Sequence, residues 1–219
     1  MNTMKQESLL VDGPAGGIEV YVDQLEAAQT QRGVALIAHP HPLFGGTADN
    51  KVVTTLARAL RELGYVTLRP NFRGVGASSG SHDNGIGESE DMLALHAYAQ
   101  SRCAAVPASP IVLAGYSFGA YVMALVARRL VALDDPAQRL ILVGTATGEV
   151  TGARSYDTGT VAADSLLIHG DLDETVPLAN VLAWARPQEL PVVVVPGADH
   201  FFHRKLHILR NIVHASWPR

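Results

Sequence analysis

The stretch Ile111-Val-Leu-Ala-Gly115-Tyr116-Ser117-Phe118-Gly119 decides how this chain is organised. An apolar, β-branched run leads directly into Gly-x-Ser-x-Gly, and residues 118–132 then favour an amphipathic helix. The order is therefore strand, sharp turn and helix, with a single serine at the turn. Side chains in place of the two glycines would collide with neighbouring backbone, so the turn is tight. Such a turn lifts the Ser117 hydroxyl above the edge of a sheet, where a nucleophile can act.

Strand-like and helix-like segments alternate on both sides of this stretch. A hairpin is expected where residues 8–11 and 18–23 flank a turn rich in glycine. Strands this apolar are buried on both faces, as in a parallel sheet covered by helices, so the sequence predicts one three-layer α/β domain over residues 1–219. The expected strands are 33–38, 65–69, 111–114, 140–143, 165–168 and 191–195, and the expected helices are 49–63, 88–101, 118–132, 176–185 and 203–215.

Length, charge and cysteine content restrict the class of protein. The 219 residues suffice for one well-packed domain and are short for two. A formal net charge of -4 gives no electrostatic reason to expect a nucleic-acid partner, and the single cysteine excludes an intramolecular disulfide. The N-terminus lacks the apolar core of a signal peptide, and no apolar run approaches the ~20 residues that span a bilayer. We therefore expect a cytoplasmic protein without a membrane partner.

Two later segments carry the residues that a serine nucleophile needs. A serine hydroxyl reacts poorly at neutral pH unless a base lies within hydrogen-bond reach, and the base needs a group that orients it. His169-Gly-Asp-Leu-Asp173 follows the strand expected at 165–168, and Pro196-Gly-Ala-Asp-His200 follows the strand expected at 191–195. The carboxyl ends of the strands form the active-site edge of such sheets, so both loops are expected to lie near Ser117. The chain order is serine, acid, histidine.

With these three segments in this order, the chain resembles the α/β-hydrolase superfamily over nearly its whole length. Ala38-His-Pro-His-Pro-Leu-Phe-Gly-Gly-Thr47 and Asn71-Phe-Arg-Gly-Val-Gly76 resemble, more narrowly, a small bacterial branch of predicted serine hydrolases without a lid domain. The resemblance implies a nucleophile at Ser117, a base at His200 and an acid at Asp173. It also implies a mostly parallel central sheet with helices on both faces, and chemistry without a cofactor.

The acid has a close competitor on the same loop. Asp173 matches the aspartate of the family segment His-Gly-x-x-Asp-x-x-Val-Pro, and Asp171 is the alternative. Glu174 and Asp199 are weaker candidates, because Asp199 directly precedes His200 on a tight loop. Capping of the loop is the structural interpretation of whichever aspartate is not catalytic.

Ester cleavage places negative charge on the former carbonyl oxygen, and two backbone N–H groups typically bind it. Phe118 is the first expected donor, because it follows the nucleophile at the start of a helix. The second donor is expected in the loop after residues 33–38. Pro40 and Pro42 have no N–H group, which leaves His41 first and Leu43 second.

Two further patterns are interpreted as structural. His39 and His41 could suggest a metal pair, but the intervening prolines and the lack of a nearby cysteine or carboxylate argue against one, and no metal is predicted. Arg73 begins an Arg-Gly-x-Gly segment that fits no phosphate-binding pattern. It is expected to pair with Asp83 or Glu88, either to brace the site or as a weak surface ion pair.

Residues 144–164 are too short for a helical lid and show no helical periodicity, so we expect an open, shallow site for small or exposed acyl groups. The leading hypothesis is a serine hydrolase that cleaves small carboxylic esters through an acyl-enzyme. The alternatives are a peptidase or thioesterase with the same three residues, and a binding protein that has lost the chemistry. The side chains expected to form an apolar acyl wall are Leu43, Phe44, Tyr116, Phe201 and Phe202.

Overall fold

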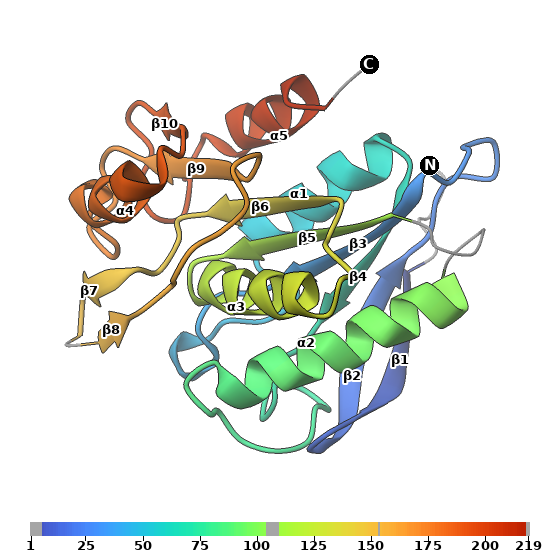
Figure 1. Ribbon diagram of the computed structural model, residues 1–219. Coiled ribbons are helices and arrows are strands. Elements are labelled where there is room, and N and C mark those ends of the chain that lie inside the picture. The colour runs from blue at the N-terminus through green and yellow to red at the C-terminus, as the bar shows by residue number, and fades with distance from the viewer. Residues whose placement is uncertain (1–5, 104–109, 153, 218–219) are drawn as a thin grey trace.

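The centre of the molecule is an eight-stranded sheet with the strand order β1-β2-β4-β3-β5-β6-β9-β10 (Figure 1). The computed structural model describes residues 6–103, 110–152 and 154–217. Strand β2 pairs antiparallel with β1 and with β4, and the other neighbours pair parallel. The strands are β1 (Gln6–Gly13), β2 (Gly16–Asp23), β3 (Gly33–Ala38), β4 (Tyr65–Pro70), β5 (Ile111–Tyr116), β6 (Arg139–Val143), β9 (Leu166–Gly170) and β10 (Val192–Val195).

Helices cover both faces of this sheet. Helices α1 and α5 pack beside each other on one face, and α2 and α3 pack on the other (Figure 1). The predicted α/β-hydrolase fold, a mostly parallel sheet between two helical layers, is therefore confirmed. The helices are α1 (Lys51–Glu62), α2 (Ile86–Tyr98), α3 (Phe118–Ala132), α4 (Leu178–Ala185) and α5 (Leu206–Ala215), with shorter turns η1 (Pro42–Phe44), η2 (Ala99–Cys103) and η3 (Arg186–Gln188).

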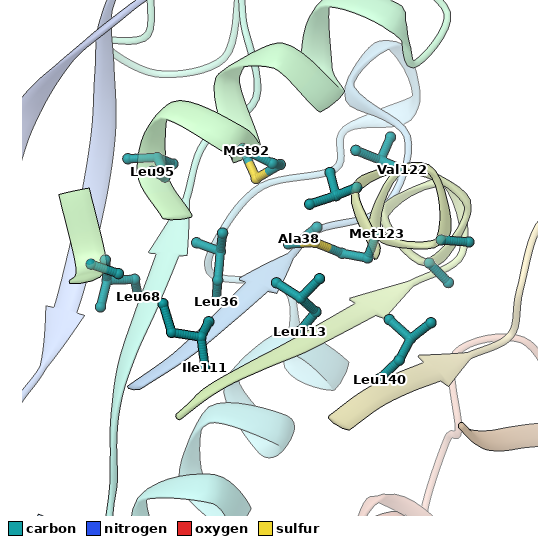
Figure 2. Packing of buried hydrophobic residues seen from close by; sticks show 14 of the residues in the cluster. Leu36, Ala38, Leu68, Met92, Leu95, Ile111, Leu113, Val122, Met123 and Leu140 are labelled. Carbon is teal, nitrogen blue, oxygen red and sulfur yellow. The ribbon is translucent and has the colours of Figure 1, made fainter. Parts of the chain in front are cut away.

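The central strands alternate their side chains between two apolar cores. Every residue of β3, β4 and β5 is buried, as expected for strands with helices on both sides. Leu36 and Leu113 point into the core under α2 and α3, where they meet Met92 and Met123 (Figure 2). The intervening residues, with Tyr116 among them, point into the core under α1 and α5. Full burial of each large apolar side chain contributes about 1.5–3 kcal/mol, so this alternation fixes the strand register.

Four of the five predicted helices begin at a residue other than the predicted one. Helix α1 begins at Lys51 instead of residue 49, because the Asn50 side chain accepts the Val52 N–H and caps it. Helix α5 begins at Leu206 instead of residue 203, because Phe202 and Arg204 adopt positive φ values that interrupt a helix. Helix α4 begins at Leu178, directly after its N-cap residue Pro177. Helix α2 begins two residues earlier than expected, at Ile86, because the Glu88 carboxylate accepts the Gly85 N–H and so caps the first turn.

A small antiparallel hairpin stands where the sequence predicted no regular structure. Strands β7 (Gly148–Val150) and β8 (Arg154–Tyr156) lie beyond the carboxyl ends of the central strands (Figure 1). With three residues each, they are too short for an alternating pattern to be recognised. The described part of residues 144–164 contains no helix, in agreement with the lidless prediction. None of the helices in the described ranges has the length and apolar character needed to cross a membrane.

Candidate active site

Ser117 occupies the turn between β5 and α3 and has φ 57° and ψ -120°. A positive φ is rare for a residue with a side chain, and such strain costs about 1–3 kcal/mol that the surrounding packing must offset. The flanking glycines make the turn possible. A Cβ on Gly115 would collide with the backbone of Gly119, and one on Gly119 would collide with the carbonyl oxygens of Ala38 and His39. The turn therefore needs both glycines, as the sequence predicted.

The structure brings Ser117, His200 and Asp173 together in one hydrogen-bonded chain. His200 Nε2 lies 2.9 Å from Ser117 Oγ, and His200 Nδ1 lies 2.7 Å from Asp173 Oδ2. The three residues come from the loops after β5, β10 and β9, and all three are buried. An Nδ1–H donated to Asp173 leaves the Nε2 lone pair directed at the serine hydroxyl. This is the tautomer that can accept a proton from Ser117.

Their hydrogen bonds distinguish Asp173 from Asp171, which the sequence alone could not do. The second carboxylate oxygen of Asp173 accepts the N–H groups of Thr175 and Val176 at 2.9 and 2.8 Å, which fixes the orientation of the group toward His200. Asp171 is exposed and accepts the Gly197 N–H at 2.6 Å, so it ties the loop after β9 to the loop after β10. Asp171 thus caps a loop, and Asp173 faces the imidazole.

The other two carboxylates considered in the sequence form no ion pair with His200 in the described part of the chain. Asp199 pairs with His203, and the His203 side chain is largely exposed while that of Asp199 is partly exposed. Glu174 is exposed next to Asp173. Among these four acidic residues, Asp173 alone contacts the ring of His200.

The three backbone N–H groups expected from the sequence as oxyanion donors differ in their hydrogen bonds. Among the described residues, the N–H groups of Phe118 and His41 have no hydrogen-bond acceptor. The Leu43 N–H is already occupied, because it donates to Nδ1 of the His41 ring at 3.3 Å. The His41 carbonyl accepts the N–H groups of Phe44 and Gly46, which holds this loop in place. Of the two residues proposed from the sequence for the second donor, His41 has the free N–H.

Two further histidines beside the site have structural partners. His39 accepts the Phe72 N–H at Nε2 and lies 2.6 Å from the Pro40 carbonyl at Nδ1, and its burial lowers its pKa to about 4. His169 Nε2 contacts the Val176 carbonyl at 2.9 Å and lies 3.4 Å from Asp173 Oδ2. Burial also lowers the pKa of His169. Both rings therefore favour the neutral form and support the loops that carry the candidate catalytic residues.

The prediction of an apolar acyl wall is wrong for two of the five side chains named. Tyr116 and Phe202 are fully buried in the core under α1 and α5. The Tyr116 hydroxyl donates to the His200 carbonyl at 2.8 Å, so this side chain supports the histidine loop from below. Leu43, Phe44 and Phe201 are exposed at 71%, 69% and 53%, and these remain available to a ligand.

The expected partners of Arg73 are also wrong. Arg73 forms a two-point ion pair with Asp91, at 2.9 and 2.8 Å, and both side chains are largely buried. Glu88, in the first turn of α2, instead lies 2.7 Å from Nδ1 of His82 in the preceding loop. Asp83 accepts the Gly87 N–H. Asp91, which the sequence analysis did not consider, lies one helical turn beyond Glu88 on α2.

Comparisons with known proteins agree with this fold. A family model described as alpha/beta hydrolase fold matches residues 43–160. An alpha-beta serine hydrolase homologue from Coxiella burnetii is 39% identical, with a TM-score of 0.83 over 100% of both chains. A lidless α/β serine hydrolase from Xanthomonas campestris is 38% identical, with a TM-score of 0.83 over 99% of this chain and 94% of that one. An uncharacterised protein of Rickettsia prowazekii is 33% identical over 89% of this chain and 81% of its own length.

The chain belongs to the α/β-hydrolase fold family. Within that family it is similar to lidless serine hydrolases, and it carries a buried Ser-His-Asp arrangement at the carboxyl end of its sheet. The family and this arrangement together support a hydrolase. Sequence reasoning missed three features around the site: the support from Tyr116, the contact of His82 with Glu88, and the position of Arg154 on the β7–β8 hairpin. Each depends on how distant loops meet.

Proposed function

We propose that this protein is a serine hydrolase that cleaves small carboxylic esters through an acyl-enzyme intermediate. One observation carries the proposal: the continuous chain from Ser117 Oγ to His200 Nε2 at 2.9 Å and from His200 Nδ1 to Asp173 Oδ2 at 2.7 Å. A base within this distance makes the hydroxyl a competent nucleophile, and a buried carboxylate fixes the productive tautomer of the base. The similarity to serine hydrolases of about the same length supports it.

Each side chain has a defined part in the first half of the reaction. Ser117 Oγ attacks the ester carbonyl carbon while its proton passes to His200 Nε2. Asp173 stabilises the resulting imidazolium through the Nδ1–H bond. The negative charge on the former carbonyl oxygen is bound by the N–H groups of Phe118 and His41. Each such donor is worth roughly 3 kcal/mol of barrier. The tetrahedral intermediate then collapses, and the leaving alcohol takes the proton from His200.

The second half returns the enzyme to its starting state. Water attacks the acyl group on Ser117 and gives a proton to His200. The second tetrahedral intermediate expels Ser117, which recovers its proton from His200, and the carboxylic acid leaves. The site is open because only the short β7–β8 hairpin stands where a lid would be, so water reaches the acyl-enzyme directly. Peptidases and thioesterases use the same steps with a different leaving group.

Labelling and turnover test this proposal together. Wild type should react with a fluorophosphonate probe and should hydrolyse 4-nitrophenyl acetate, because the probe captures a serine activated by its base. Ser117→Ala should lose both signals. Ser101→Ala is a matched control, since Ser101 is exposed and its hydroxyl donates only to the Tyr98 carbonyl among described residues. Ester turnover that persists in Ser117→Ala, or a folded wild type that neither labels nor turns over, would contradict the proposal.

A further inference from the structure

The β7–β8 hairpin and the loop after β3 meet beside the candidate nucleophile. In the sheet, β5 lies between β3 and β6. The η1 turn follows β3, and the hairpin follows β6 (Figure 1). The guanidinium carbon of Arg154 on β8 lies 4.3 Å from the centre of the Phe44 ring on η1. This contact joins the two loops that flank the carboxyl end of β5, and it therefore forms one wall around Ser117.

Two imidazoles extend this wall. The rings of His41 and His82 lie 4.6 Å apart, and both pack on the Phe118 ring at 4.9 and 5.3 Å. Nδ1 of His41 accepts the Leu43 N–H, so the proton of the neutral ring lies on Nε2 and can be donated. Nδ1 of His82 is engaged by Glu88, so only its Nε2 remains for another partner. Hydrogen-bonding groups thus stand where the sequence predicted an apolar surface.

The positive charge of Arg154 has no acidic partner within the described ranges. Its side chain is partly buried, and one of its N–H groups donates to the Thr151 carbonyl at 2.7 Å, but no carboxylate lies within ion-pairing distance. Glu88, whose charge acts on His41, is fully buried and accepts hydrogen bonds from His82, Asp83 and Gly85. A partly buried cation without a counter-charge is costly, and an anionic ligand would remove that cost.

The electrostatics of His41 agree with this placement. The pKa of His41 is lowered to about 4, mainly by burial and in smaller part by the nearby charges of His82 and Arg154, while Glu88 opposes the shift. The Arg154 charge is therefore felt at the residue whose N–H is the second oxyanion donor. His41 stays neutral at physiological pH, so its Nε2–H acts as a hydrogen-bond donor without adding a charge.

We propose that Arg154, His41 and His82 form a subsite for a carboxylate carried by the substrate, so that this enzyme prefers esters with an acidic group over neutral esters of the same shape. The inference rests on the proposed ester hydrolysis. One N–H of the guanidinium stacked on Phe44 donates to Thr151, and its Nε is buried without a partner among the described residues. The remaining N–H groups carry the positive charge and can donate to a carboxylate. The Nε2–H of His41 supplies a further donor. Phe44, exposed beside them, offers an apolar surface to the carbon chain between ester and acid.

Pairs of charged and neutral esters test the subsite. Monomethyl glutarate against methyl pentanoate places the acid on the acyl side, and 4-acetoxybenzoate against phenyl acetate places it on the leaving side. Wild type should favour the charged member of at least one pair by about tenfold to a hundredfold in kcat/KM, the range for one charge-assisted contact. This preference should weaken as salt concentration rises, because ions screen the contact. The pair that shows it identifies the side of the ester that faces Arg154.

Three variants assign the preference to its residue. Arg154→Gln should bring the ratio of charged to neutral ester close to one, and Arg154→Lys should keep part of it. Arg186→Gln is the matched control, because Arg186 is exposed on η3. It should keep the wild-type ratio. Fluorophosphonate labelling of Arg154→Gln shows that the variant is folded with an intact nucleophile, so that a changed ratio reports binding.

Each outcome has a definite meaning. An active wild type that shows no preference for either charged ester overturns the carboxylate subsite, and so does a preference that survives Arg154→Gln at full size. Absence of both labelling and ester turnover in wild type instead overturns the proposed hydrolase function itself. The two failures are therefore distinguishable in one set of measurements.

Discussion

Substitution of aspartate by asparagine tests which of the two aspartates in the loop after β9, Asp173 or Asp171, orients His200. In Asp173→Asn, the amide oxygen can still accept the N–H groups of Thr175 and Val176, which hold the side chain in place. The amide NH2 then faces Nδ1 of His200 and donates to it. The imidazole must carry its proton on Nε2, and that N–H points at Ser117 Oγ, 2.9 Å away. The base can no longer accept the serine proton.

The expected loss in kcat is about 10⁴-fold, which corresponds to roughly 5.5 kcal/mol of barrier. The same change at Asp171 is the matched control. The Asp171 carboxylate accepts only the Gly197 N–H among the described residues, and an asparagine oxygen can accept the same N–H. Asp171→Asn should therefore keep kcat within about threefold. Both variants should unfold at nearly the wild-type denaturant midpoint, because neither loses a backbone hydrogen bond.

Steady-state hydrolysis of 4-nitrophenyl acetate, with active sites counted by phosphonate titration, provides the measurement. If Asp173→Asn kept kcat within about tenfold of wild type, the tautomer argument would be refuted. Equal losses in the two variants would show that the loop as a whole matters and that Asp173 has no special part.

Three further predictions concern the support of the site. Gly119→Ala should cost about 3 kcal/mol or prevent folding, because its Cβ would meet the carbonyl oxygens of Ala38 and His39; urea unfolding measures this. Tyr116→Phe should cost about 1–3 kcal/mol and reduce kcat, because the buried His200 carbonyl loses its donor; an unchanged kcat with altered acyl preference would instead restore Tyr116 to the acyl wall. His39 has its folded pKa lowered from 6.5 to about 4, so the unfolded chain binds the proton first as pH falls. The contribution of the neutral His39 ring to the free energy of unfolding is present above pH 6.5 and is lost as the pH falls toward 4. The protein should therefore be about 2 kcal/mol less stable near pH 5 than near pH 7. His39→Gln should flatten that dependence in denaturant titrations, and an equally steep dependence in the variant would contradict it.

The features that local sequence determines were predictable. The turn at Ser117 follows from two glycines between an apolar strand and a helix, and both glycines face backbone that leaves no space for a side chain. Strand and helix positions followed from periodicity, because both faces of the sheet are covered. The order of serine, acid and histidine placed the three loops at one edge of the sheet. Local patterns therefore predicted the family and the three candidate residues.

The features that depend on contacts between distant loops were not predictable. Asp171 and Asp173 lie two residues apart, and only the path of the loop decides which one faces His200. Tyr116 is the exception, because a count along the strand from Val112 and Ala114 places it on the side of β5 that points into the core under α1 and α5. Arg154 lies on a strand of three residues, and its contact with Phe44 joins segments more than a hundred positions apart.

Capture of the acyl-enzyme tests the central claim most directly. Wild type mixed with 4-nitrophenyl acetate and quenched in acid during the first turnovers can be digested and analysed by mass spectrometry. We expect one acetyl group on the peptide that contains Ser117, with a burst of nitrophenolate equal to the number of labelled sites. An active enzyme that shows neither burst nor acetylated peptide, or that carries the acetyl group on another residue, would contradict Ser117 as the nucleophile.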